Sequence, residues 1–537
     1  MSREDLKIHH VTFFWIIQWR LIKEKKKLLS DLKARINMPV LALSGGALTL
    51  FVLFSIIFPE NIAQLVDKGF SLSITYFGAY WQLLLLATFL VGLVLSLSKY
   101  GKVRLGNIDK PQLSFYQWAS IITASGLGAG AIFWAAAEPM YYFLETPPMY
   151  QGVESATADA VQPALAQSFM DWGFTTWAAY GSISAIIIMY AHHNKGLALR
   201  PRTLVYPIFG KKIEHSKWGV AVDVFCILGA AAGAIGTIGF FGFQFSYWLH
   251  DLIGTPDTFI MQLSAVAVLI IIVVISAVTG LNKGIQFFSK FNVWLAALLG
   301  IFILILGPGG FIIDQLIASY GTYIENFINM STYRGDNEWL GAWMLFFFGW
   351  FIGFGPLMSI LVARVSRGRT IREIFFVVSI VAAVSSHVWF SIVGGSGLFY
   401  EMINTGSVSE PLLEFGLPAA IIATASQLPL GTLVVTVFLL ITVTFVVTTA
   451  DSMSYSLSMA VTGEGDPPKI MRAFWAIIMG AIAVILINIG EGSVDALQSF
   501  IIVTAVPISI IMLPSLWGAP QIAKILAIEQ GITKKNK

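Results

Sequence analysis

The stretch SGLGAGAIFWAAAEP, residues 125–139, lies within a long apolar segment and decides how the rest of the chain is interpreted. Its glycines alternate at positions 126, 128 and 130, and it ends in Glu138-Pro139. Each glycine weakens a helix by about 0.5–1 kcal/mol relative to alanine, so the helix can unwind here. In a membrane, irregular backbone survives only where it is buried or lines a cavity. The stretch is therefore either a small-residue face for close helix packing or a broken helix at a binding site.

The composition of the whole chain is that of a polytopic membrane protein. Of its 537 residues, 56% are hydrophobic and only 12% are charged, which no soluble domain of this length needs. The single cysteine, Cys226, excludes an intramolecular disulfide and a thiolate metal cluster. Neither a GxxxxGK[ST] phosphate loop nor an HExxH zinc motif occurs. With no nucleophile–base pair either, we expect no enzyme, no organic cofactor and no nucleic-acid partner.

Twelve apolar segments are long enough to cross a hydrocarbon core of about 30 Å as helices. They are residues 39–58, 75–98, 113–137, 165–190, 219–247, 259–279, 291–308, 339–363, 373–395, 430–460, 470–489 and 495–517. Residues 311–330 are too polar to span and predict an amphipathic helix along the outer interface. Residues 1–38 form a basic cytoplasmic segment, and residues 518–537 form a short tail. The transmembrane domain is thus expected over residues 39–517.

The positive charges lie on one side of this predicted arrangement. Of the 33 Lys and Arg residues, 31 fall in the N-terminal segment, the tail and the connections that follow even-numbered spans. The opposite side holds only Lys68 and Arg334. Because basic residues concentrate on the cytoplasmic side, both termini are predicted to be cytoplasmic, in a multi-pass protein of the plasma membrane.

Four strings from different parts of the chain occur together. They are GLGAG with the following AEP, RPRTLVYPIFG (200–210), RVSRGRTIRE (364–373) and TFVVTTADS (444–452). In combination they resemble the betaine/carnitine/choline transporter family, and the resemblance covers the chain from the first span to the twelfth. It implies a sodium-symporter-like fold of two inverted five-helix repeats, about 113–308 and 339–517, preceded by two extra helices. It also implies a homotrimer and quaternary-ammonium substrates that are taken up with Na⁺ or H⁺, or exchanged.

Three aromatic residues of the fourth span share one helix face. On a continuous helix Trp172, Trp177 and Tyr180 fall within an arc of about 140°. Ring faces attract a cation that has no N–H group to donate, with about 0.5–2 kcal/mol for each contact. The alternative is an ordinary packing face or interface belt. The family resemblance favours an aromatic cage that binds the quaternary-ammonium group of the substrate.

The eighth span departs from the family pattern. Its sequence GWFIGFGP, residues 349–356, keeps a tryptophan at Trp350 but has Phe351 and Phe354 where the resemblance implies further tryptophans. Phenylalanine offers a weaker cation–π face than tryptophan. The substrate is therefore left open between glycine betaine and other zwitterions, such as carnitine, ectoine-like or amino-acid-like solutes. Its carboxylate is expected against the backbone N–H groups of Ser125, Gly126 and Gly128.

A cation site is expected where the tenth span faces the glycine stretch. Thr448 and Thr449 offer adjacent hydroxyl oxygens, although paired threonines also serve helix packing. The resemblance implies that they bind Na⁺ together with the carbonyl of Phe445 and the backbone of Ala124 and Leu127.

Other positions bear on the coupling ion. The positions that resemble a second sodium site hold Ala230 and Ala234, so one site is expected. Sodium-independent members carry an arginine on this fifth span, but none lies between Val220 and Leu249, and proton-coupled choline members carry aspartate where Gly130 stands. The sequence thus predicts Na⁺-coupled import, with sodium-independent antiport or H⁺ symport as alternatives.

Three carboxylates lie within or near the ends of predicted spans, where ionisable groups are costly. For Glu138, Asp223 and Asp451 we expect partners among helix ends and freed backbone amides. A proton relay is the alternative role.

Overall fold

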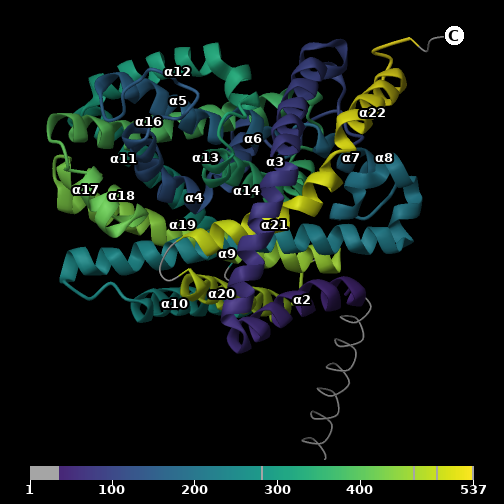
Figure 1. The fold of residues 1–537 in the computed structure, drawn as a ribbon. Coiled ribbons are helices and arrows are strands. Elements are labelled where there is room, and N and C mark those ends of the chain that lie inside the picture. Colours follow the sequence, from purple (N-terminus) through teal and green to yellow (C-terminus); the bar gives the residue numbers. More distant parts are fainter. Residues whose placement is uncertain (1–35, 280–281, 464–465, 491–493, 535–537) are drawn as a thin grey trace, which may run out of the picture.

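The computed structural model shows a chain built from helices (Figure 1). It describes residues 36–279, 282–463, 466–490 and 494–534. Within those ranges there is no strand, only an isolated antiparallel bridge between Arg104 and Thr370. The α-helices are α2 (Met38–Ile57), α3 (Pro59–Leu97), α4 (Phe115–Leu144), α5 (Val161–Asp171), α6 (Phe174–Ala178), α7 (Ser184–Met189), α8 (Tyr206–Phe209), α9 (Lys217–Ile253), α10 (Phe259–Thr279), α11 (Asn282–Leu306), α12 (Gly309–Thr332), α13 (Asn337–Ala342), α14 (Met344–Val365), α15 (Ile371–Phe375), α16 (Ala382–Ile403), α17 (Ser409–Phe415), α18 (Leu417–Gln427), α19 (Gly431–Thr462), α20 (Lys469–Ile489), α21 (Asp495–Met512) and α22 (Ser515–Glu529). Short 3₁₀ and π turns join some of them: η1 (Lys99–Lys102), η2 (Ala158–Ala160), η3 (Tyr190–Asn194), η4 (Pro201–Val205), η5 (Gly210–His215) and η6 (Phe376–Val381).

The helices confirm an all-α membrane fold. In the described ranges nine helical segments are long and apolar enough to cross a bilayer, and eleven if each of two bent pairs counts as one span. These eleven correspond to eleven of the twelve predicted segments. The basic N-terminal segment lies outside the described residues, apart from 36–38.

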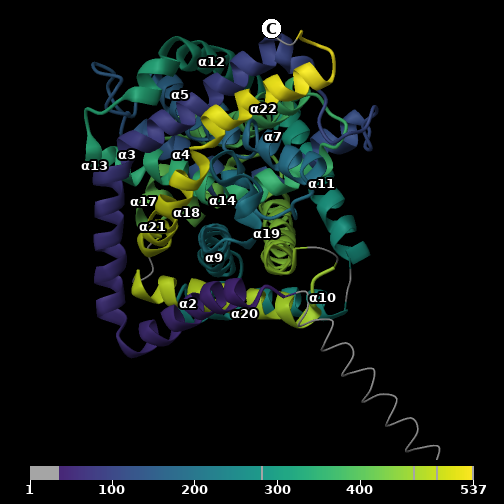
Figure 2. The same ribbon diagram turned by 90° about the vertical axis from the view of Figure 1, so that its right-hand side faces the viewer.

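Helix α9 occupies the middle of the molecule, and Figure 2 looks along it. It packs against α10, α14, α19, α20 and α21, and most residues of its most apolar stretch are buried. Ser216 caps its first turn by accepting a hydrogen bond from the backbone N–H of Trp218. Cys226 lies on this helix and is fully buried.

The predicted fourth span, residues 165–190, is not one helix but the pieces α5, α6 and α7 followed by the π turn η3. Two glycines mark the breaks. A Cβ on Gly173 would lie 2.0 Å from the Phe169 carbonyl oxygen, and Gly181 has φ of +126°, which only glycine adopts readily. The segment is buried by the surrounding helices. Protein partners therefore replace the bilayer around it, and irregular backbone is tolerated.

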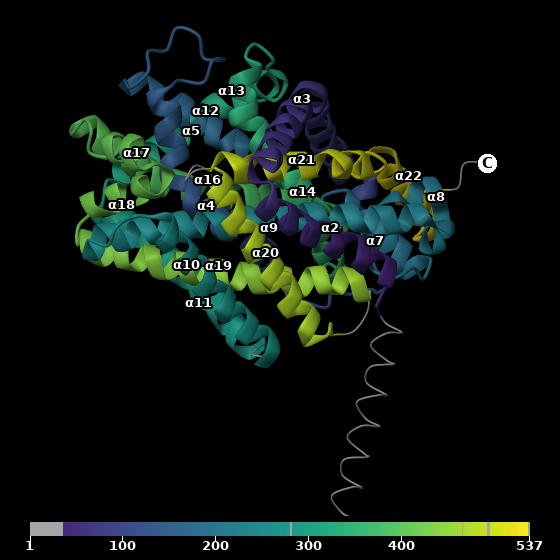
Figure 3. The same ribbon diagram turned by 60° about the horizontal axis from the view of Figure 1, so that its bottom comes forward.

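Helix α12 matches the predicted helix 311–330 and turns by 106° from the preceding stretch of α11, across Gly307-Pro308. It packs on α5 and α16, which lie below it in the view of Figure 1. The short helices α17 and α18 pack on each other before α19 and were not predicted (Figure 3). The chain beyond residue 517 is also helical, because α22 continues to Glu529 and packs on α7 and α3.

Candidate functional site

The glycine stretch forms a bend in α4. The halves Phe115–Gly126 and Gly130–Leu144 meet at 61°, while the backbone stays helical through the bend. The sequence predicts that the helix unwinds at these glycines; in the structure the helix bends there and does not open into a turn. Ser125 is exposed at the bend. Leu127 and Gly128 lie outside the part of the chain whose side chains are described.

The glycines of this bend make room for aromatic rings. A Cβ on Gly126 would lie 2.2 Å from Cζ3 of Trp177, and a Cβ on Gly130 would lie 2.8 Å from Cη2 of Trp350. Both distances are below any real carbon–carbon contact, so neither position accommodates a side chain unless a ring moves. The small residues therefore serve close approach of α4 to an aromatic cluster, and not only helix–helix packing.

The predicted cage residues converge on Phe351. Its ring centroid lies 5.7 Å from that of Trp172, 5.9 Å from that of Trp177 and 4.7 Å from that of Tyr180. Trp177 and Tyr180 also meet edge to face at 5.4 Å. All four side chains are buried. We call these four residues the aromatic cage; the structure brings them together from α14 and from the broken segment around α6.

Two neighbouring residues of α14 take different positions. Trp350 meets Trp172 at 6.1 Å and continues the aromatic cluster toward Phe240 and Phe346. Phe354 instead packs on α9, where a Cβ on Gly233 would lie 2.3 Å from its ring. Among the described residues it has no ring contact with the aromatic cage.

Both tryptophans of the aromatic cage are fixed by hydrogen bonds. The Trp172 indole N–H donates to Glu138 Oε2 at 2.8 Å, and the Trp177 indole N–H donates to Ser386 Oγ at 3.0 Å. These bonds set the ring planes, because an indole has only one donor. Sequence reasoning noticed Glu138 but assigned it to helix ends, and it missed Ser386. No pattern in the sequence predicts a contact between residues as far apart in the chain as Trp177 and Ser386.

The other buried carboxylates have structural partners. Asp223 accepts from the backbone N–H and the guanidinium of Arg202, with the ion pair at 2.7 Å. Asp451 pairs with Arg472 at 3.1 Å. The backbone N–H of Arg202 is the kind of partner predicted for Asp223, whereas Asp451 pairs with a side chain and not with a freed backbone amide.

A further buried carboxylate, Asp171, was missed by the sequence analysis. It accepts hydrogen bonds from the Tyr142 hydroxyl at 2.7 Å and from the Gln167 amide at 3.1 Å. Asp171 directly precedes Trp172, so this network anchors α5 beside the aromatic cage.

The residues expected to bind Na⁺ lie on two helices that pack together, α4 and α19. The Thr448 hydroxyl donates to the Phe445 carbonyl oxygen at 2.9 Å, so these two oxygens are adjacent. Thr448 is buried, whereas Thr449 and Ala124 are half-buried. Among the described residues, no group of three or more His, Cys, Asp or Glu side chains is placed to hold a metal ion. A cation between α4 and α19 would therefore bind neutral oxygens.

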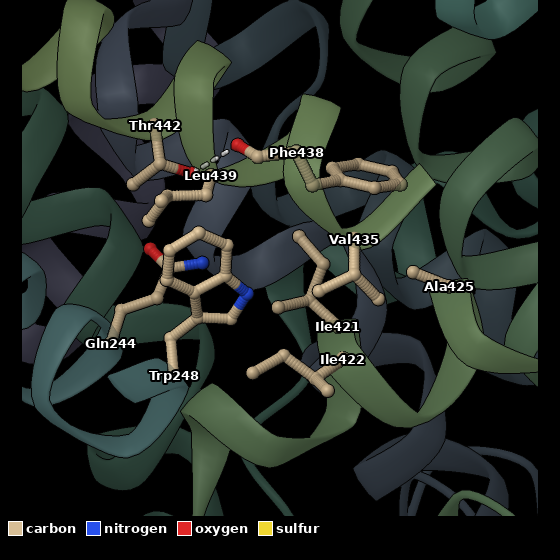
Figure 4. Close-up of a pocket in the computed structure, with 9 residues that line it drawn as sticks. All are labelled: Gln244, Trp248, Ile421, Ile422, Ala425, Val435, Phe438, Leu439 and Thr442. Atoms are coloured by element: carbon tan, nitrogen blue, oxygen red, sulfur yellow. Dashed lines mark hydrogen bonds between the residues drawn. The ribbon is translucent and has the colours of Figure 1, made fainter. Parts of the chain in front are cut away.

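Two cavities lie outside the aromatic cage. The smaller lies between α9, α18 and α19, where Figure 4 shows Gln244 and Trp248 facing the side chains of Ile421 and Val435. Its volume of about 10 Å³ is close to the minimum for one water molecule, so it does not hold a solute.

The larger cavity, of about 400 Å³, has the size of a small-ligand site. Aromatic side chains and two carboxylates line it, including Trp134, Trp343, Phe415, Asp257 and Asp495. The Trp134 ring lies 5.2 Å from Phe347, which lies 5.5 Å from Trp172. A layer of rings thus separates this cavity from the aromatic cage.

Comparisons with known proteins agree on one family. Residues 39–526 match the family model described as betaine/carnitine/choline family transporter. The chain is 46% identical over 500 residues to glycine betaine transporter 2 of Vibrio parahaemolyticus, covering 93% of this chain and 92% of that protein. It is 32% identical over 478 residues to a probable glycine betaine transporter of Desulfitobacterium hafniense, with coverage of 88% and 95%. It is 30% identical over 488 residues to an ectoine/hydroxyectoine transporter of Virgibacillus pantothenticus, with coverage of 90% and 95%.

Proposed function

The chain belongs to the betaine/carnitine/choline family of transporters, and we propose that it is a secondary transporter that imports glycine betaine together with Na⁺. The observation that carries the proposal is the convergence of Trp172, Trp177 and Tyr180 on Phe351. A trimethylammonium group has no N–H donor, so ring faces are the groups that recognise it in a desolvated site. The ammonium head would lie among these rings, with its carboxylate toward the backbone at Ser125 and Gly126.

The choice of solute rests on the relatives and on one residue of the aromatic cage. The relative that is 46% identical is named for glycine betaine, and one that is 30% identical is named for ectoine and hydroxyectoine. This chain has Phe351 where the family resemblance implied tryptophan, but its ring contacts all three partners. The cage therefore keeps four faces, which supports glycine betaine over a solute without a quaternary head.

Na⁺ coupling is proposed from the placement of oxygen atoms. The Phe445 carbonyl and the Thr448 hydroxyl are adjacent on α19, which packs on α4. Thr449 and the backbone of Ala124 and Leu127 would complete the site. Hard cations take such oxygen ligands, and a cation there would hold α19 against the half of α4 that carries Gly126.

The larger cavity provides a route for the solute. Its lining residues come from the ends of helices that the charge pattern places on the outer side. Carboxylates and aromatic rings raise the local concentration of a solute with a cationic head. Movement of Trp134 and Phe347 would join this cavity to the aromatic cage.

We further propose the architecture that the family resemblance implies. The eleven candidate spans and the buried segment from α5 to η3 would together make twelve crossings, with inverted repeats over about 113–308 and 339–517. Both termini would be cytoplasmic, in the plasma membrane, and α12 would lie along the outer interface. The assembly would be a homotrimer.

Uptake by the purified full chain in liposomes tests this function. Radiolabelled glycine betaine should accumulate under an inward Na⁺ gradient, and carnitine, choline, ectoine and proline serve as competitors. Accumulation under a proton gradient alone would overturn Na⁺ coupling, and counterflow without Na⁺ would indicate exchange. Trp177→Leu should abolish saturable uptake. Uptake by Trp177→Leu with unchanged apparent affinity would refute the aromatic cage.

A further inference from the structure

Glu138 is a fully buried carboxylate that directly contacts the aromatic cage. It is 0% exposed, and its Oε2 accepts the indole N–H of Trp172 at 2.8 Å. Its Oε1 has no hydrogen-bond partner; the nearby Ser168 hydroxyl donates instead to the Ala164 carbonyl at 3.3 Å. None of the ion pairs formed among the described residues includes Glu138. The carboxylate thus faces no cation of the protein.

The neighbouring groups do not supply a positive charge. Asp171 is a second buried carboxylate nearby, and the Tyr142 hydroxyl donates to Asp171. A buried charge without a partner of opposite sign is costly. Among the described residues, the buried carboxylates Asp223 and Asp451 are neutralised by Arg202 and Arg472. Glu138 lacks such a partner, although it lies beside the residues proposed to bind a permanent cation.

The hydrogen bond connects the carboxyl group of Glu138 to the binding surface, and a cation bound there would favour its ionised form. When a carboxylate accepts the indole N–H, the donor proton is drawn toward it and the ring gains electron density. The negative face of the ring, which attracts cations, becomes more negative. A quaternary-ammonium head on the Trp172 ring would therefore be attracted by the polarised ring and by the carboxylate behind it.

We propose that Glu138 is the counter-charge of the substrate's ammonium group, acting through the Trp172 indole, and that it sets the preference for cationic over uncharged heads. This inference rests on the proposed function. It assigns Glu138 a role in specificity, in addition to its role in orienting the ring. The bound solute would complete the ion pair that the protein leaves open.

The test compares two ligands of one shape. The first is glycine betaine, and the second is its carbon isostere, in which a tert-butyl group replaces the trimethylammonium group. Dissociation constants are measured by tryptophan fluorescence on the full chain in nanodiscs. Glu138→Gln keeps an acceptor for the indole but removes the charge. We expect it to weaken glycine betaine by about tenfold and to leave the isostere unweakened.

Each outcome has one meaning. Equal weakening of both ligands would show that Glu138 only orients the ring, and it would overturn the proposal. Asp171→Asn is the matched control, because it removes a nearby buried charge that accepts from Tyr142 and Gln167 and not from the Trp172 indole; an equal loss of preference there would also overturn the assignment to Glu138. If Glu138→Gln does not fold, Glu138→Asp and Glu138→Asn form a pair of equal length that differs only in charge. A wild-type chain that binds neither ligand would refute the proposed function itself.

Discussion

Tyr180 and Phe351 stack with their ring centroids 4.7 Å apart and their planes 24° from parallel. Tyr180 follows the short helix α6, whereas Phe351 lies on α14, so this contact closes the aromatic cage across two elements far apart in the sequence. Both side chains are buried. A solute head that enters between them must separate the rings, and the strength of this contact is therefore part of the binding free energy.

Replacing Phe351 by leucine should reduce affinity without unfolding the protein. Leucine keeps most of the volume but has no ring face, so the loss should be about 0.5–2 kcal/mol, or roughly twofold to thirtyfold in apparent affinity for glycine betaine. Competition in liposome uptake measures it. Phe89→Leu is the matched control, because Phe89 stacks on Phe174 at 5.7 Å outside the aromatic cage. A similar affinity change in both variants would contradict the assigned role of Phe351.

Removing the two hydroxyls of Thr448 and Thr449 should raise the Na⁺ concentration needed for half-maximal uptake. The alanine double variant removes two of the proposed oxygen ligands while α19 stays helical. Thr442→Ala is the control, since Thr442 donates to the Phe438 carbonyl at 2.9 Å in the same way, farther along α19. Initial uptake rates over a Na⁺ series provide the measurement. An unshifted Na⁺ dependence in the double variant would indicate H⁺ coupling or exchange.

Gly126→Ala should damage the site and the fold together. The new Cβ would overlap the Trp177 ring at 2.2 Å, and such overpacking costs about 1–3 kcal/mol. At Gly46, on α2, a Cβ would meet nothing within 4 Å, and alanine there should stabilise the helix by about 0.5–1 kcal/mol. Thermal unfolding in detergent compares the two. If Gly126→Ala were as stable as Gly46→Ala, the close contact between α4 and Trp177 would not exist.

Asp223→Ala should destabilise the protein rather than change its substrate affinity. It leaves the Arg202 guanidinium buried without its partner, which costs about 3–5 kcal/mol. The double variant Arg202→Met with Asp223→Leu should recover much of this loss, because it leaves no unpaired charge. Melting temperature and the apparent affinity of the remaining folded protein are the two readouts. Altered ion coupling in Asp223→Ala at wild-type stability would support the proton-relay alternative.

Apolar segment length and the distribution of charge were sufficient to predict most of the helices. A bilayer requires long apolar segments, and positive charges concentrate on its cytoplasmic side. The predicted spans 259–279 and 470–489 coincide with α10 and α20 to within one residue. The break at Gly181 was not predictable, since the positive φ and the close approach to Val362 on another helix leave no local pattern in the sequence. The helices α17 and α18 were missed because they are too short to show an apolar period.

The aromatic cage was predicted better than the groups that support it. Trp172, Trp177, Tyr180 and Phe351 converge, although the helical-arc argument assumed a continuous helix that the structure does not have. The resemblance also grouped Phe354 with them, but its ring packs on Gly233. Ser386 and Asp171 carry no local signal, because a hydrogen bond between distant helices leaves no periodic trace.

The burial of Cys226 has a practical consequence for measuring orientation. It is the only cysteine in the sequence, and its thiol has no exposed surface, so thiol reagents should leave the wild-type chain unlabelled. Exposed Glu154 and Asp109, on loops predicted to face opposite sides, can each be changed to cysteine without first removing native thiols. In intact cells a membrane-impermeant maleimide should then label position 154 and spare position 109. The natural sequence is thus already a single-cysteine background for mapping sidedness.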